Sequence, residues 1–72
     1  MEIKKAVGIR LKQIRKSNNY TQQKLAEASG IDRTFISHIE KGNRNITIET
    51  IEKFTLTIGI NMKSFFNSKV FE

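Results

Sequence analysis

The sequence predicts an all-α fold of five short helices, because three observations agree. Apolar residues recur at helical spacing in several segments, residues suited to N-caps precede most of these segments, and glycines follow several of them. With 72 residues, no proline and no cysteine, the chain is expected to form one domain over residues 1–72. The helices are expected near residues 2–17, 22–29, 33–41, 48–58 and 62–67.

The first helix follows from four apolar residues, Ile3, Val7, Leu11 and Ile14. They recur at steps of four, four and three, so they share one helical face. The polar segment Ser-Asn-Asn at 17–19 should end this helix, because short polar side chains compete with the helical backbone for hydrogen bonds.

The second helix is expected to start after Thr21, whose hydroxyl can accept a hydrogen bond from a free backbone N–H group. Leu25 and Ala26 should form its buried side, with Ala28 contributing. Gly30 should end it, since glycine adopts the turn conformation that other residues resist.

The third helix is expected between an Asp32 cap and Gly42, with Ile36 and Ile39 facing the core. Only about three residues, Gly30 among them, separate it from the second helix. This short connection is typical of a helix-turn-helix.

The fourth helix should start after Thr47, carry Ile51, Phe54 and Ile58 at helical spacing, and end at Gly59. Isoleucine and threonine are frequent here, which is also typical of strands. The pattern nevertheless fits a period of about 3.6 better than strict alternation, so a helix is the prediction.

A fifth helix capped by Asn61 would carry Phe65 and Phe66, and Val70 and Phe71 follow it. These are many large apolar side chains for the end of a chain, so we expect them to serve partly as core. The remainder could form a self-complementary patch across a two-fold axis. A homodimer with Phe65, Phe66, Val70 and Phe71 at its interface is therefore predicted. The alternative is that all four belong to the core or to a frayed tail.

The chain is strongly basic, with 13 Lys and Arg against 7 Asp and Glu and a formal net charge of +6. Such an excess predicts a polyanionic partner, which would be DNA, RNA or an anionic membrane. No apolar run approaches the roughly 20 residues that span a bilayer, and no membrane partner is expected. The basic N-terminal helix keeps a membrane surface as a minor alternative, and RNA is disfavoured because no aromatic stacking platform is evident.

On the segment 33–41 the side chains that point away from the two core isoleucines are Thr34, Ser37, His38 and Lys41, and Arg33 lies on a flank in the first turn. Any one of them alone would be an ordinary surface residue, but together they suit the DNA major groove, which admits one helix. First-turn residues usually reach deepest, and arginine can donate two hydrogen bonds to guanine while threonine contacts thymine. The predicted base contacts are Arg33, Thr34, Ser37 and His38, with Arg33 and Thr34 as the main ones.

Contacts to the DNA backbone are expected on either side of this helix. Gln22 and Gln23 open the second helix, where free N–H groups and a partial positive charge favour a phosphate, and Gln22 could also brace a base-contacting side chain. Such contacts position a protein on DNA without specifying sequence. The predicted backbone contacts are Gln22, Gln23, Phe35, Lys41, Asn43, Arg44 and Asn45.

Two stretches resemble a known family. "YTQQKLAEASGIDRTFISHIEKG" resembles the Cro/C1-type, lambda-repressor-like (XRE) helix-turn-helix, and "DRTFISHIEKGNRNITIETIEKF" resembles the controller proteins of restriction-modification systems. The resemblance spans roughly residues 6–67. It implies a five-helix fold and a homodimer on a near-palindromic operator. It also implies DNA contacts by Gln22, Arg33, Thr34 and Ser37, with the 43–45 loop on the DNA backbone.

The resemblance further implies an ion pair between Arg15 and Glu40, which would tie the third helix to the scaffold. If exposed, such a pair is worth only about 0–1 kcal/mol. Two positions depart from the controller pattern. Phe35 stands where tyrosine is common, which removes a hydroxyl contact to DNA, and His38 stands where a small residue is common, which would alter the preferred operator.

The resulting hypothesis is a cytoplasmic, nucleoid-associated transcription regulator, most similar to a restriction-modification controller. The resemblance adds RNA polymerase as a partner, with activation at low protein level and repression at high level. Two alternatives remain open, another Cro/C1-type repressor and an antitoxin that binds a protein and represses its own operon. A neighbouring toxin gene would indicate the antitoxin, whereas neighbouring endonuclease and methyltransferase genes would indicate the controller.

An enzyme is not expected. Asp32, Ser37 and His38 have the residue types of a hydrolase triad, but Ser37 and His38 are neighbours on one helix and diverge. One histidine and no cysteine are a poor supply of metal ligands, and no glycine-rich phosphate loop is present. We therefore predict no metal, no cofactor and no small-molecule substrate.

Overall fold

The computed structural model describes residues 1–72 and contains five α-helices and no strand, as predicted. The helices are α1 (Ile3–Ser17), α2 (Gln22–Ser29), α3 (Arg33–Glu40), α4 (Ile48–Ile58) and α5 (Met62–Phe66). A 3-10 turn at Lys69–Phe71, which the sequence did not predict, follows them. Helix α1 begins one residue later than expected, and α3 and α5 each end one residue earlier. None of the helices combines the length and apolarity needed to cross a bilayer.

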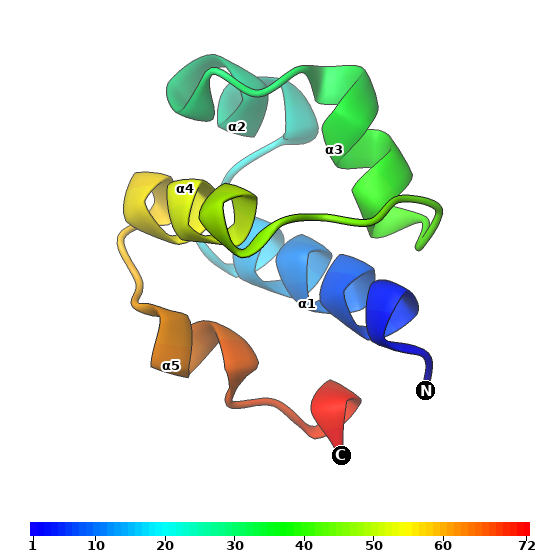
Figure 1. Cartoon of the computed structure of the whole chain (residues 1–72). Helices are drawn as coiled ribbons and strands as arrows, with labels where there is room; N and C mark the ends of the chain where they lie inside the picture. Colours follow the sequence, from blue (N-terminus) through cyan, green and yellow to red (C-terminus); the bar gives the residue numbers. More distant parts are fainter.

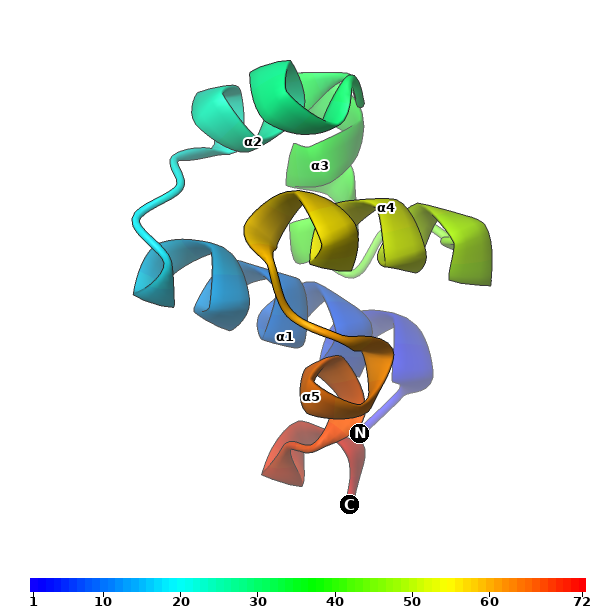
Figure 2. The same cartoon turned by 90° about the vertical axis from the view of Figure 1, so that its left-hand side faces the viewer.

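The helices are stacked so that the helix-turn-helix occupies one end of the molecule. Figure 1 shows α2 and α3 at the top, α1 and α4 across the middle, and α5 with the C-terminus at the bottom. The turned view in Figure 2 keeps this order. The outer surface of α2 and α3 is therefore remote from the C-terminal aromatic residues.

All five helices contribute to one hydrophobic core. Nine buried side chains form it, namely Val7, Leu11, Ile14, Leu25, Ile36, Ile39, Ile51, Phe54 and Phe65. Two expectations about burial were wrong. Ile3 is 61% exposed, because it lies in the first turn of α1 and borders an open groove. Ala28 is exposed as well, since α2 instead buries Ser29, one turn after Leu25.

The helix boundaries follow from local hydrogen bonds that the sequence predicted. Each of the four expected N-cap side chains accepts a hydrogen bond from a backbone N–H in the first turn of its helix. The caps are Thr21, Asp32, Thr47 and Asn61, and the donors are the N–H groups of Lys24, Thr34, Thr50 and Ser64. Gly30 and Gly59 end α2 and α4 in the left-handed conformation, with φ of 75° and 96°.

A glycine allows α1 and α3 to approach closely. Gly8 is buried within α1, and a Cβ atom at this position would overlap the backbone carbonyl oxygen of Ile39 and crowd that of Glu40. The absence of a side chain at Gly8 therefore brings the C-terminal end of α3 onto the scaffold helix.

Candidate nucleic-acid interface

Helix α3 is anchored on one side and open on the other. Ile36 and Ile39 are both 0% exposed, whereas Arg33 and Thr34 in the first turn are exposed to solvent. Ser37 and His38 are partly exposed. The four predicted base-contacting residues therefore lie outside the core, which is required of a helix that inserts into the DNA major groove.

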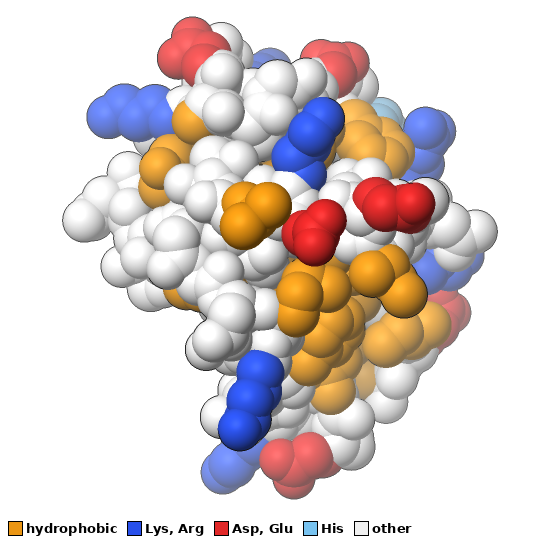
Figure 3. Space-filling view, turned by 60° about the vertical axis from the view of Figure 1, so that its left-hand side comes forward, with side chains coloured by type: hydrophobic (Ala, Val, Ile, Leu, Met, Phe, Trp, Pro, Cys, Tyr) orange, Lys and Arg blue, Asp and Glu red, His pale blue; other side chains and the backbone are white.

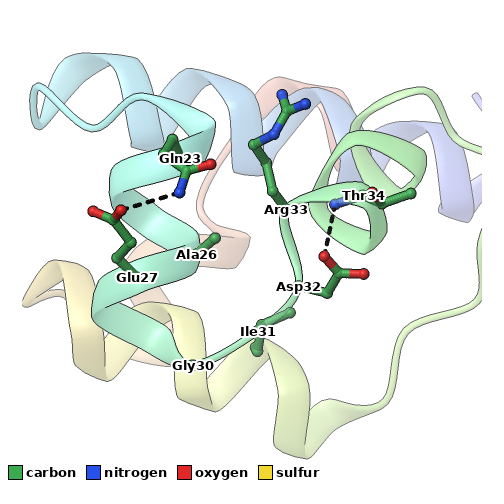
Figure 4. Close-up of a pocket in the computed structure, with 8 residues that line it drawn as sticks. All are labelled: Gln23, Ala26, Glu27, Gly30, Ile31, Asp32, Arg33 and Thr34. Carbon is green, nitrogen blue, oxygen red and sulfur yellow. Dashed lines mark hydrogen bonds between the residues drawn. The ribbon is translucent and has the colours of Figure 1, made fainter.

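Arg33 is available to bind a ligand. It makes no ion pair or side-chain hydrogen bond within the chain, and Figure 4 shows its guanidinium extending away from the backbone. The neighbouring Asp32 carboxylate instead accepts the N–H of Thr34 at 3.3 Å and caps the helix. All five N–H donors of Arg33 therefore remain free for a base edge or a phosphate.

The start of α2 forms a second polar element beside Arg33. Thr21 Oγ1 accepts the N–H of Lys24 at 3.0 Å, while the N–H groups of Gln22 and Gln23 have no intrahelical partner. A surface hollow at this helix start is lined by both glutamines, Lys16 and Arg33. Lys16, in the last turn of α1, was missing from the predicted contacts, although its basic side chain lies near the end of a helix that precedes the motif.

Arg15 and Glu40 form the implied ion pair, and it is buried. Arg15 donates from Nε to Glu40 Oε2 at 2.8 Å and from Nη2 to Oε1 at 2.9 Å, and the two side chains are only 7% and 4% exposed. A third bond runs from Arg15 Nη1 to the carbonyl oxygen of Tyr20 at 2.9 Å. The pair thus joins α1, the α1–α2 connection and the end of α3, and the small value of an exposed pair does not apply to it.

The Gln22 side chain is held by a hydrogen bond within the chain. Its Nε2 donates to Glu40 Oε1 at 3.1 Å, so the buried ion pair holds the amide in place. Gln22 is therefore itself braced, and in this structure it does not brace a base-contacting side chain. The other glutamine, Gln23, donates to Glu27 Oε2 along the exposed side of α2 at 3.0 Å.

The loop after α3 presents further polar groups next to the helix. Lys41, Asn43, Arg44 and Asn45 are all exposed. The N–H of Asn43 donates to the carbonyl oxygen of His38 at 3.0 Å, which turns the chain away from the helix axis. Arg44 lies over the ring of Phe35, with its guanidinium carbon 5.2 Å from the ring centroid.

The predicted dimer residues are more covered than expected, and the assignment of Phe65 needs correction. Phe65 is only 2% exposed and belongs to the core, so it has no surface for a partner. The turn that follows α5 packs on α1 and places Phe71 against Phe65 and Phe66, with ring centroids 6.2 and 5.1 Å apart. Val70 and Phe71 are partly buried, which leaves Phe66, 40% exposed, as the most accessible of the four.

An apolar groove that the sequence did not reveal lies beside Phe66. Ile3 and Ile48, 61% and 73% exposed, line it together with Phe66 and three more covered residues, Val7, Ile46 and Ile51. Figure 3, seen from the side of α4, shows hydrophobic side chains gathered on this face. Ile48 is the first residue of α4 and lies on the same side of the helix as Ile51 and Thr55, so its exposure shows that the core ends before it.

A family model described as helix-turn-helix matches residues 11–65, which include α2, α3 and the short turn between them. The chain belongs to this family. The predicted family is thereby confirmed, and so is the likeness to controller proteins, because several of the similar chains carry that name.

Several curated relatives of this chain are controller proteins. Control protein C.BamHI of Bacillus amyloliquefaciens is 42% identical over 57 residues, which cover 78% of this chain and 70% of the relative. Control protein C.MunI of a Mycoplasma species is 34% identical over 67 residues, covering 92% and 90%. Among solved structures, the tetramer of the restriction-modification controller protein C.Esp1396I in complex with its natural 35 base-pair operator has a TM-score of 0.84. That chain is 35% identical, with 92% of this chain and 87% of that chain covered.

Proposed function

We propose that this protein is a sequence-specific DNA-binding transcription regulator that controls a restriction-modification operon. The observation that carries the proposal is the outward side of α3, where the side chains of Arg33 and Thr34 are exposed and make no hydrogen bond within the chain, while Ile36 and Ile39 anchor the opposite side. This arrangement stands within a helix-turn-helix whose similar chains include several controller proteins.

In the proposed complex α3 lies in the major groove. Arg33 donates two hydrogen bonds to O6 and N7 of a guanine, and Thr34 contacts a thymine methyl group or a neighbouring base edge. Ser37 and His38, one turn further on and partly exposed, contact the next bases. The free N–H groups at the start of α2 and Lys16 hold a phosphate on one side, and the loop after α3 holds the backbone on the other.

A second copy of the chain would complete the complex. We place the dimer contact at the apolar groove of Ile3, Ile48 and Phe66, because these residues expose more apolar surface than Val70 or Phe71. Asn45 of the loop after α3 also lines the groove, so pairing two such grooves would bring both loops near the two-fold axis. The two α3 helices would then contact half-sites about 34 Å apart on the DNA. The resemblance to controller proteins adds RNA polymerase as a further partner in this proposal.

The dimer contact predicts that Ile48→Lys makes the protein monomeric. A second charge in the groove, which Lys4 already lines, would have to be desolvated on association, whereas Ile48 is exposed in the single chain and contributes little to its core. Sedimentation equilibrium at tens of micromolar should show a dimer for the wild type and a monomer for the variant. Leu56→Lys, an equally exposed position on the same helix but outside the groove, should leave the dimer intact. A wild-type monomer, or equal effects of the two changes, would count against this surface.

Two arginine variants test the DNA contacts. Arg33→Ala should cost about 1–3 kcal/mol on the preferred duplex and relax the preference at one base position. Arg44→Ala should weaken binding to preferred and scrambled duplexes alike, and should reduce the slope of log K against log salt by about one. Fluorescence anisotropy titrations over a series of salt concentrations measure both effects. Identical behaviour of the two variants on both duplexes would show that Arg33 does not contact a base.

A further inference from the structure

We infer that Phe35 is a positioning residue, whose ring holds the guanidinium of Arg44 beside α3 before DNA arrives. The inference rests on the proposed DNA-binding function and assigns to Phe35 a role that acts through another side chain. A phenyl ring carries no hydrogen-bond donor for a phosphate. The contact to the DNA backbone that was expected from Phe35 would therefore be made by Arg44.

The geometry is that of a cation–π contact. The guanidinium carbon of Arg44 lies 5.2 Å from the centroid of the Phe35 ring, within the distance of about 6 Å over which such attraction acts. Phe35 is partly buried and packs against the hydrophobic core, so its ring is a fixed surface. Arg44, in contrast, comes from the exposed loop between α3 and α4.

The ring is the main restraint on Arg44. The Arg44 side chain makes no ion pair and no hydrogen bond. Residues 44–46, which lie between α3 and α4, make no backbone–backbone hydrogen bond. The last such bond before them joins the N–H of Asn43 to His38. Without the ring, this long side chain would be free to adopt many rotamers, and ordering it on DNA would oppose binding.

The contact leaves the cation able to bind an anion. A carboxylate partner would neutralise Arg44 and occupy its N–H groups, whereas a ring face occupies none of them. The five donors stay available for phosphate oxygens while the plane of the guanidinium is restrained. The Phe35–Arg44 pair therefore presents an oriented charge next to the base-contacting side chains of α3.

A double-mutant cycle on DNA binding tests this coupling. The four proteins are the wild type, Phe35→Leu, Arg44→Ala and the double variant, titrated with the duplex that the wild type selects from a random pool, over a series of salt concentrations. Phe35→Leu should weaken binding about two- to fivefold and move the salt slope toward that of Arg44→Ala. In the Arg44→Ala background, Phe35→Leu should have no further effect. Phe35→Tyr, which keeps the ring and adds a hydroxyl group that can contact DNA, should bind at least as tightly as the wild type.

The free protein provides a second measurement that needs no DNA. Ring-current shifts of the Arg44 side-chain protons in NMR spectra should be present in the wild type and in Phe35→Tyr, and absent in Phe35→Leu. Two results would overturn this inference and leave the proposed function standing. One is an equal loss of affinity from Phe35→Leu with and without Arg44, and the other is unshifted Arg44 protons in the wild type. A folded wild type that binds no duplex would overturn the proposed function, and this inference with it.

Discussion

Replacing Glu40 with alanine should destabilise the protein by about 3–5 kcal/mol, because the substitution leaves the Arg15 guanidinium buried without its partner. The two side chains are 7% and 4% exposed, so water cannot readily replace the lost carboxylate. Folded domains are stable by only about 5–15 kcal/mol, and a domain this small lies toward the low end. The variant should therefore be largely unfolded near physiological temperature.

Urea denaturation followed by circular dichroism measures this loss. The matched control is the double variant Arg15→Met, Glu40→Leu, in which both charges are removed together. Replacing a complete buried pair by apolar residues is often neutral, so most of the stability should return. Recovery should be incomplete, because the Tyr20 carbonyl and Gln22 lose the partners that Arg15 and Glu40 provide. If Glu40→Ala lowers the free energy of unfolding by less than about 1 kcal/mol, the pair does not stabilise the fold as a buried ion pair should.

Gly8→Ala should also destabilise the fold, by about 3 kcal/mol, although the same change in an ordinary helix interior stabilises by about 1 kcal/mol. The added Cβ would overlap the carbonyl oxygen of Ile39, a backbone atom that can move only if α3 moves. Because α3 carries the proposed base contacts, affinity for DNA should fall together with stability.

Thermal unfolding and DNA titration of this variant should be compared with those of Gln13→Ala. Gln13 is exposed on the same helix, so an alanine there should leave both stability and binding nearly unchanged. A Gly8→Ala protein that is more stable than the wild type would mean that α1 and α3 do not meet closely at this point.

Features that depend on neighbouring residues in the chain were accessible from the sequence. The caps at Thr21, Asp32, Thr47 and Asn61 are local, because each side chain bonds to a backbone N–H two or three residues further on. The positions of Ile36 and Ile39 followed from helical periodicity, and both are fully buried. The outward direction of Thr34 follows from the same two anchors, which place Arg33 on a flank of the helix.

Features that depend on packing between helices were not accessible. Periodicity shows that Ile3 shares a face with Val7, but not that the core ends between them, where the groove opens. Phe65 and Phe66 are adjacent residues of the same type, and only the orientation of α5 determines that the first is buried and the second exposed. The resemblance supplied the partners Arg15 and Glu40, yet their burial depends on how α1, α2 and α3 meet.

Selection of bound duplexes from a random pool at physiological salt tests the central claim most directly. If α3 inserts into the major groove and the chain acts as a dimer, the bound duplexes should share two inverted half-sites centred about 10 base pairs apart. Arg33→Ala should then lose the preference for guanine at one symmetric pair of positions. A pool that stays random, or a shared sequence that Arg33→Ala leaves unchanged, would contradict recognition by this helix.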